Sequence, residues 1–412
     1  MTDPLYELTL TALTYGGEAM GRLDGGRAVF VPFGLPGERV RIRLAEEKRG
    51  YARGEIVEVL QAAPERITPR CKHFGQCGGC HYQHISYKMQ LTAKADILRD
   101  QLQRIGKIEN PPVQETVASP NEWNYRNHIQ FHLDNHGKPG FQASASNQVI
   151  PISECHLPES PINSFWPQLE FEPDNGIDRV SIRKGISDEL MLVLESDSPE
   201  TPALEIEADI SAVHVFEDHV LVLAGNDAIM IQVLDREFRV SPTSFFQTNT
   251  GMAEKMVKHI LDRLPISQST ILDVYCGVGL FSAFIAPRCK QLIGIESSPS
   301  ACDDFTVNLD EFDNVELYEG LAEDILPDLE SRDANPDTVL VDPPRAGVER
   351  EALAAIVKSN PKTIVYVSCD PSTLARDAKR LIDSGYKLLD TTPFDLFPQT
   401  YHIESISFFE QR

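Results

Sequence analysis

Short apolar runs alternate with helical patterns over residues 241–412, and this alternation constrains the fold more than any other feature of the sequence. The apolar runs are TILDVYC, QLIGIE, VELYEG, TVLVDPP, TIVYVSC, YKLLDTT and ISFFE. Such alternation is typical of βαβ units, which place parallel strands in one sheet with helices on its faces. The sequence therefore predicts an α/β domain with a mostly parallel, doubly wound, seven-stranded sheet of the Rossmann-like type.

A glycine-rich turn follows the first run, in the sequence Asp273-Val-Tyr-Cys-Gly-Val-Gly279. Ligands of doubly wound folds bind at the carboxyl ends of the strands, where glycines let the backbone approach them closely. The second run ends in Glu296, whose carboxylate can accept hydrogen bonds from both hydroxyls of a ribose. Asp324, after the third run, can lie near an adenine edge. The turn matches neither G-x-G-x-x-G nor a P-loop. It predicts a nucleotide-type site, although an ordinary turn between a strand and a helix can have the same sequence.

Two further strand ends carry residues that suit catalysis. The fourth run ends in Asp342-Pro-Pro-Arg345, and the two prolines hold the backbone rigidly. The carboxylate of Asp342 can then accept a hydrogen bond from a pyrimidine N3–H. The fifth run ends in Cys369, at the same predicted edge of the sheet. We interpret Cys369 as a nucleophile; a strand-end cysteine that only packs is the alternative.

A thiol at such a site can activate a pyrimidine ring. C5 of a uracil is too weak a nucleophile to take a methyl group directly, but addition of a thiolate to C6 gives C5 carbanion character. After C5 has taken the methyl group, a base must remove the C5 proton before the thiolate leaves. Glu404, just before the last run, is the candidate base, because burial raises the pKa of a carboxyl group. His402 is the competing candidate.

Residues 1–60 predict a small β-barrel. Apolar stretches such as LYELTLTAL and RVRIRL alternate there with glycine-rich turns. About five strands at this spacing suit an OB-like barrel, a fold that often binds nucleic acids. A barrel with a purely structural role fits the pattern equally well.

The charge of the chain is unevenly distributed. Residues 1–150 carry 18 Lys and Arg against 16 Asp and Glu, a balance of +2. Residues 151–412 carry 20 against 46, a balance of -26, and the two sum to the net charge of -24. A surface that binds phosphate groups is therefore expected in the N-terminal third of the chain.

The cysteines also fall into groups. Cys71, Cys77 and Cys80 have the spacing C-x5-C-x2-C, and Cys155 is a fourth, distant thiol. On spacing alone, four such thiolates suit zinc and an iron–sulfur cluster about equally. The remaining thiols are interpreted as non-catalytic: Cys276, Cys289 and Cys302.

We see neither a secretory signal nor a run of apolar residues long enough to cross a membrane, so we expect a cytoplasmic protein.

Seven sequence blocks together resemble the RNA uridine-5-methyltransferase family that includes bacterial tRNA and 23S rRNA enzymes. They are CxxxxxCGGCxxQH at 71–84, YRN at 125–127, SFFQTN at 244–249, DVYCGVG at 273–279, DPPR at 342–345, SCDPSTLARD at 368–377 and HIES at 402–405. The blocks follow the family's order along nearly the whole chain, and the last four together are highly specific.

The resemblance implies S-adenosylmethionine-dependent methylation of C5 of a uridine in RNA. It implies that Cys369 is the nucleophile and Glu404 the proton acceptor. Asp342 and Gln247 would also contact the substrate base. Leu280 stands where the family often has Asn, so no donor contact from that side chain is expected. The donor-binding positions implied are Gln247, Tyr275, Gly277, Gly279, Glu296, Asp324 and Asp342.

The resemblance also implies a division into three parts. Residues 1–62 would form a TRAM domain that binds RNA, and residues 241–412 the catalytic domain. Between them, an α+β domain at 63–240 would carry a [4Fe–4S] cluster in the segments 63–110 and 150–158. The implied cluster ligands are Cys71, Cys77, Cys80 and Cys155.

The tRNA-specific members of this family often lack the barrel and the four cysteines, so the presence of both implies 23S rRNA as the RNA partner, although the family has also adopted other RNA substrates. A tRNA substrate of the uridine-54 type is the alternative within the family. An RNA cytosine-5-methyltransferase and a non-catalytic RNA-binding protein are alternatives outside it. We expect a monomer, because the sequence shows neither a coiled-coil pattern nor a long apolar edge strand.

Overall fold

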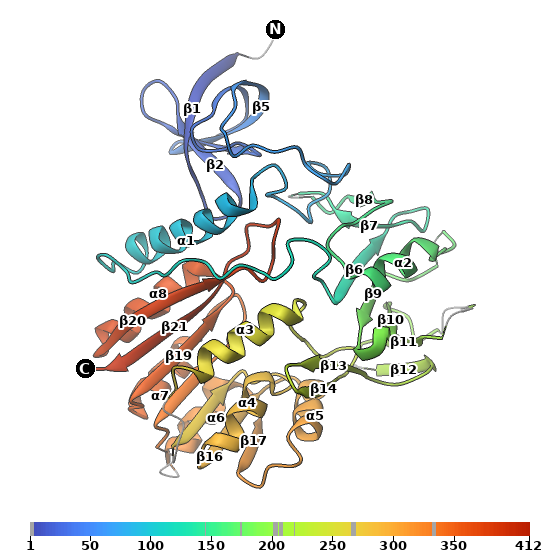
Figure 1. Ribbon diagram of the computed structural model, residues 1–412, viewed down its shortest axis with the longest axis vertical. Coiled ribbons are helices and arrows are strands. Elements are labelled where there is room, and N and C mark those ends of the chain that lie inside the picture. Colours follow the sequence, from blue (N-terminus) through green and yellow to red (C-terminus); the bar gives the residue numbers. More distant parts are fainter. Residues whose placement is uncertain are drawn as a thin grey trace.

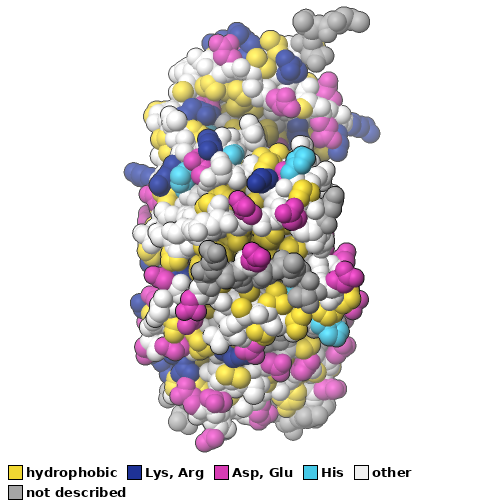
Figure 2. Space-filling view, turned by 90° about the vertical axis from the view of Figure 1, so that its right-hand side faces the viewer, with side chains coloured by type: hydrophobic (Ala, Val, Ile, Leu, Met, Phe, Trp, Pro, Cys, Tyr) yellow, Lys and Arg dark blue, Asp and Glu magenta, His cyan; other side chains and the backbone are white. Residues whose placement is uncertain are grey.

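The computed structural model describes residues 4–144, 146–173, 175–200, 205, 209–217, 219–264, 269–331 and 335–412. The long helix α1 (Tyr87–Arg104) lies between an N-terminal β-barrel and a C-terminal α/β domain, and a central mixed sheet lies to one side (Figure 1). On the face shown in Figure 2, acidic side chains predominate over the lower half, and Lys and Arg are more frequent toward the barrel. No helix in the described part of the chain is long and apolar enough to cross a membrane.

Five strands close the N-terminal barrel in the order β1-β2-β3-β5-β4. They are β1 (Leu5–Leu13), β2 (Glu18–Arg22), β3 (Ala28–Pro32), β4 (Arg39–Glu47) and β5 (Tyr51–Gln61). Alternate residues point inward, as the two-residue period of a strand requires, and Leu10, Val31 and Ile42 are fully buried. The predicted five-stranded barrel is confirmed.

The central domain is built on a seven-stranded sheet in the order β12-β11-β10-β9-β6-β7-β8. Strands β10 and β11 pair in parallel, whereas β9 pairs antiparallel with both β10 and β6. The short helix α2 and the hairpin β13–β14 pack beside β9. The elements are β6 (His128–Leu133), β7 (Pro139–Gln142), β8 (Val149–Pro151), α2 (Ser160–Phe165), β9 (Arg179–Lys184), β10 (Leu190–Glu195), β11 (Ser211–Phe216), β12 (His219–Ala224), β13 (Ile229–Val233) and β14 (Arg236–Val240).

The C-terminal domain has the predicted seven-stranded sheet, in the order β17-β16-β15-β18-β19-β21-β20. Its strands are β15 (Thr270–Val274), β16 (Gln291–Glu296), β17 (Val315–Glu319), β18 (Thr338–Val341), β19 (Thr363–Ser368), β20 (Tyr386–Phe394) and β21 (Glu404–Gln411). Its helices are α3 (Thr250–Leu261), α4 (Leu280–Ile285), α5 (Pro299–Asn308), α6 (Ala322–Ser331), α7 (Arg350–Lys358) and α8 (Pro371–Asp383). The last strand, β21, lies between β19 and β20 and is antiparallel to both.

The two hydrophobic cores of this sheet extend into the rest of the chain. On one face, Leu98 and Leu102 of α1 are fully buried in the same core as Tyr386 of β20. On the other face, Met191 and Val213 of the central sheet share a core with side chains of α3 and α4. The segment boundaries at 62/63 and 240/241 stay predictions, but apolar packing crosses the second of them.

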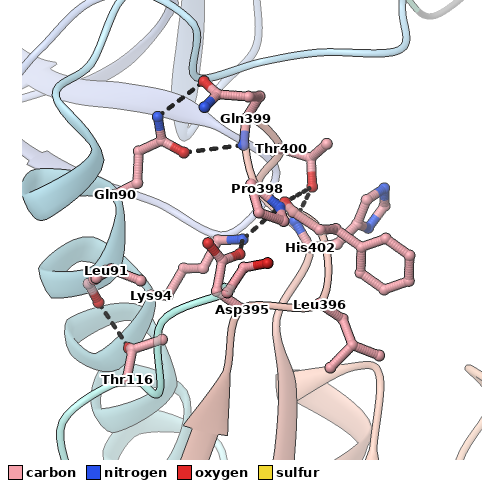
Figure 3. Close-up of polar contacts among 12 residues, drawn as sticks. Gln90, Leu91, Lys94, Thr116, Asp395, Leu396, Pro398, Gln399, Thr400 and His402 are labelled. Atoms are coloured by element: carbon pink, nitrogen blue, oxygen red, sulfur yellow. Dashed lines mark hydrogen bonds and ion pairs between the residues drawn. The ribbon is translucent and has the colours of Figure 1, made fainter. Parts of the chain in front are cut away.

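A fully buried ion pair joins α1 to residues 395–403, which we call the β20–β21 segment (Figure 3). The Lys94 ammonium donates to Asp395 Oδ1 at 2.5 Å and to the Phe397 carbonyl at 3.1 Å, and both charged side chains are 0% exposed. One turn earlier, the Gln90 side chain donates to Gln399 Oε1 and accepts from Gln399 N, both at 3.0 Å. Burial lowers the pKa of Lys94, and the charge of Asp395 opposes that effect. Helix α1 therefore holds the segment that leads into β21.

We expect Lys94→Met to lower the free energy of unfolding by about 3–5 kcal/mol, because Asp395 would keep a buried charge without its partner. Lys88→Met is the matched control: Lys88 lies exposed on the same helix, so its loss should change stability by less than about 0.5 kcal/mol. Denaturant unfolding followed by circular dichroism measures both. Equal stability of the two variants would show that the ion pair contributes no net stabilisation.

Candidate active site

The antiparallel strand β21 brings two distant parts of the chain to one point. Its Ser405 pairs with Ser368, the last residue of β19, so Glu404 and Cys369 lie next to each other at the carboxyl edge of the sheet. Strand β18 ends beside β19 and places Asp342 at the same edge. The structure therefore brings together the three side chains for which the sequence predicts chemistry on the base.

Burial and mutual repulsion raise the pKa values of these three groups. Burial and the charge of Asp342 raise the pKa of Glu404 well above its usual range. Burial and the charge of Glu296 raise the pKa of Asp342 to about 7. Burial and the two carboxylates raise the pKa of the Cys369 thiol to about 12, against the opposing charge of Arg345. A carboxyl with a raised pKa is a stronger proton acceptor once ionised, and Arg345 is the cation that favours the thiolate.

His402 is less suited than Glu404 to act as the base. Its ring meets that of Phe397 edge-on at 5.8 Å and lies 4.5 Å from that of Tyr401. Burial and the charge of Arg345 lower the pKa of His402 to about 3, so its neutral imidazole is a weak proton acceptor. The surroundings of His402 indicate a packing role.

The glycine-rich turn after β15 has a left-handed backbone at three positions. Tyr275, Gly277 and Gly279 have φ angles of 65°, 55° and 90°. Gly279 precedes α4, and a Cβ there would lie 2.4 Å from a methyl group of Leu309, so a side chain is excluded. Gly277 N donates to Glu296 Oε2 at 2.9 Å, which holds the end of β16 against the turn.

The predicted donor residues around this turn differ in exposure. Glu296 accepts from the next two backbone amides at 2.8 Å, and this fixes its carboxylate at the strand end. Asp324 lies exposed in the first turn of α6. Burial raises the pKa of Tyr275 to about 12, and the charge of Glu323, the half-buried neighbour of Asp324, contributes to this rise. Leu280 is buried as the first residue of α4. The donor contacts of these side chains stay predictions.

Gln247 lies between β14 and α3, in the block SFFQTN. It is buried, and its carbonyl accepts from Asn127 Nδ2 at 3.1 Å. Asn249 caps α3 and donates to the Leu396 carbonyl, in the β20–β21 segment, at 3.1 Å. The Tyr125 hydroxyl donates to the same segment at 3.0 Å. The blocks YRN and SFFQTN therefore position the catalytic edge through contacts inside the protein.

Sequence reasoning missed the residues that hold the loop after Asp342. Asp377 on α8 is fully buried and accepts from the Tyr366 hydroxyl at 2.9 Å and from Val348 N at 3.1 Å. Arg376 donates to two carbonyls of the same loop. These two residues close the block SCDPSTLARD, and their place in that block is the signal that the sequence offers.

Cys71, Cys77, Cys80 and Cys155 line one cavity of about 40 Å³. Among the described residues, no group of three or more His, Cys, Asp or Glu side chains is placed so that it could hold a metal ion. Its lining combines apolar side chains with polar ones that include Glu154 and Arg126, and the buried Nε of Arg126 has no hydrogen-bond partner within the described ranges. The four thiols and Arg126 thus line one space.

Two family models match parts of this chain. Residues 219–412 match the family model described as tRNA (Uracil-5-)-methyltransferase, and residues 5–57 match the TRAM domain. An uncharacterized RNA methyltransferase of Halalkalibacterium halodurans is 33% identical over 446 residues, which cover 99% of this chain and 97% of that protein. Another, from Aquifex aeolicus, is 34% identical over 100% of this chain and 99% of its own length.

A solved structure extends the comparison to three dimensions. The Pyrococcus abyssi tRNA (uracil-54, C5)-methyltransferase, in complex with S-adenosyl-L-homocysteine, superposes with a TM-score of 0.73 at 24% identity. The match covers 98% of this chain and 99% of that one, so the two share their fold over the whole length. The chain belongs to the RNA (uracil-5-)-methyltransferase family of S-adenosylmethionine-dependent enzymes and carries an N-terminal TRAM domain.

Proposed function

We propose that this enzyme methylates C5 of a uridine in RNA, with Cys369 as the nucleophile and Glu404 as the proton acceptor. The supporting observation is the pairing of β21 with β19, which sets both residues beside Asp342 at the carboxyl edge of the sheet. Methylation of an amine or a hydroxyl needs neither a thiol nor a buried carboxyl beside it, whereas methylation of a pyrimidine carbon needs both.

The residues have separate tasks in the proposed reaction. S-adenosylmethionine, when bound, supplies a methyl group activated by a sulfonium sulfur. The Cys369 thiolate forms a bond to C6 of the uracil, and the displaced electron pair makes C5 nucleophilic. Asp342 accepts the N3–H hydrogen bond and orients the ring. Once C5 carries the methyl group, Glu404 takes the C5 proton, the C5–C6 double bond forms again and the thiolate leaves.

Cys369→Ala should abolish both methylation and the covalent adduct with RNA that contains 5-fluorouridine, because no bond from sulfur to C6 can form. Glu404→Gln should lower turnover by about 10²–10⁴-fold and accumulate protein bound covalently to ordinary RNA, because the C5 proton stays on the ring. Denaturing gels with labelled RNA and mass spectrometry of the nucleosides measure these effects.

Cys289→Ala is the control for these variants, because Cys289 is half-buried just before β16, at the opposite end of that strand from Glu296. It should leave methylation and adduct formation unchanged. The product 5-methylcytidine would instead identify a cytosine-5-methyltransferase. RNA binding without any adduct in the wild type would favour a non-catalytic RNA-binding protein.

We infer that the substrate is 23S rRNA. The support is the presence in one chain of the TRAM domain and the four cysteines, a combination that the sequence resemblance associates with the rRNA branch. The Pyrococcus abyssi enzyme acts on tRNA, so tRNA is the competing substrate. After incubation with both RNAs, we expect new 5-methyluridine in 23S rRNA, mapped by mass spectrometry of nuclease fragments. Modification of tRNA alone would overturn this inference.

The cytoplasmic location and the monomeric state stay predictions.

We also propose that the four cysteines hold a [4Fe–4S] cluster with a structural role. The support is that the four thiols line one cavity, because a [4Fe–4S] cluster is held by four thiolates around one space. Such a cluster with four thiolates carries net negative charge, which the guanidinium of Arg126 would balance. The unpaired Nε of Arg126 would then have an acceptor.

Anaerobically purified protein should be brown and contain about four iron atoms per chain. Cys155→Ser should lose iron and visible absorbance, because it removes one ligand, and Cys289→Ser should keep both. Iron analysis and absorbance spectroscopy measure these effects. A colourless protein with about one zinc per chain would show that the site binds zinc instead.

A further inference from the structure

One hydrogen bond joins the N-terminal barrel to the strand end that carries the nucleophile. Tyr15, in the turn between β1 and β2, donates from its hydroxyl to Asp370 Oδ2 at 2.8 Å, although 355 positions separate the two residues. Asp370 directly follows Cys369. The barrel therefore contacts the catalytic domain one residue from the thiol.

The two oxygens of the Asp370 carboxylate have different partners. Oδ1 caps α8 by accepting from Ser372 N at 2.8 Å and Thr373 N at 3.1 Å, and Oδ2 faces the barrel. The backbone is also closed into a turn around Cys369: Asp370 N donates to Ser368 Oγ at 3.2 Å, and that hydroxyl lies 3.0 Å from the Asp370 carbonyl. Movement of the Asp370 carboxylate would therefore move the turn that carries the thiol.

The charge of Asp370 strengthens its hydrogen bond with the Tyr15 hydroxyl. Burial raises the pKa of Asp370, but the hydrogen bonds from Ser372 and Tyr15 outweigh burial and leave the pKa lowered, so the carboxylate is ionised. Burial and the adjacent carboxylate raise the pKa of Tyr15, so its hydroxyl keeps the proton that it donates. A hydrogen bond to an ionised acceptor is stronger than one between neutral groups.

The barrel has little freedom at this contact. The rings of Tyr15 and Tyr401 meet edge-on at 5.9 Å, and the ring of His81 lies 4.5 Å from Tyr401. Gly17 has a φ of 89°, and a Cβ there would lie 3.2 Å from Tyr401 Cδ1. The turn between β1 and β2, the segment around Cys80 and His81, and the β20–β21 segment thus meet at the Tyr401 ring.

We propose that Tyr15 is a positioning residue for the nucleophile. By holding the Asp370 carboxylate, it fixes the conformation of the turn that carries Cys369. Binding of RNA to the barrel is thereby coupled to the position of the thiol. This inference rests on the proposed role of Cys369. When the barrel is held against the catalytic domain by this contact, the uridine of the bound RNA meets a thiol that is already in position. The TRAM domain then contributes to the rate of the covalent step as well as to RNA affinity.

Tyr15→Phe tests the proposal, because it removes the hydroxyl and keeps the ring against Tyr401. In the full-length, metal-loaded enzyme, we expect the single-turnover rate of adduct formation with 5-fluorouridine RNA to fall about 10- to 100-fold at saturating RNA and S-adenosylmethionine. The Kd for RNA should change by less than about twofold, and the Tm by less than about 2 °C. Tyr6→Phe is the matched control, a half-buried barrel tyrosine whose hydroxyl has no hydrogen-bond partner in the described part of the chain.

Two results would overturn the proposal. An unchanged rate at saturating RNA with a raised Kd would show that Tyr15 only docks the barrel. Equal rates for Tyr15→Phe and Tyr6→Phe would show that the hydroxyl has no role. Absence of any adduct in the wild type would instead refute the proposed function.

A double-mutant cycle keeps the test decisive if Tyr15→Phe also lowers the Tm. Asp370→Asn keeps an oxygen that can cap α8 but removes the ionised acceptor of the Tyr15 hydroxyl. If Tyr15 acts through Asp370, the double variant should be no slower than the slower single variant. Rate losses that multiply would show that the two residues act separately and would overturn the proposal.

Discussion

The antiparallel pairing of β21 with β19 is the constraint on which the active site depends. Because β21 runs against its neighbours, it begins at the edge where β19 ends, and its first residue, Glu404, lies next to Cys369. A parallel strand of the same eight residues in that position would carry Glu404 to the opposite edge, about 25 Å away. Cys369 and Glu404, the proposed nucleophile and proton acceptor, are therefore neighbours through the topology of the sheet, although many residues separate them along the chain.

Polar contacts hold the loops at this edge. The strands are stabilised by apolar burial, which has no direction, but catalytic loops must be held at defined positions. Lys94 anchors the β20–β21 segment, Asp377 anchors the loop after Asp342, and Asn127 anchors the approach to α3. Each anchor is buried, so its partners cannot exchange it for water without a cost. The edge is thereby arranged before RNA arrives.

Much of this could be predicted from local sequence. Parallel strands buried in a sheet appear as short apolar runs, and the antiparallel strands β20 and β21 do so as well, so all seven strands of the C-terminal sheet are visible in the sequence. Catalytic candidates such as Cys369 and Asp342 follow such runs directly, so the same pattern places them at one edge.

The partners of these elements could not be predicted in the same way. Nothing near α1 indicates that Lys94 pairs with a residue 301 positions away, or that the helix covers the C-terminal sheet. The contact of Tyr15 with Asp370 spans a still longer stretch. The order of the central sheet was likewise not predictable, because short strands with similar apolar content can pair in many registers.

The core that Met191 and Val213 share with α3 and α4 limits how such a protein can evolve. A lineage that exchanged its central sheet for an unrelated one would expose the apolar face of the catalytic helices to solvent. Substitutions on either side of this seam must therefore compensate one another. Insertions that leave this core intact are expected in surface turns that carry no part of it. The central sheet and the catalytic helices each bury apolar surface that belongs to the other.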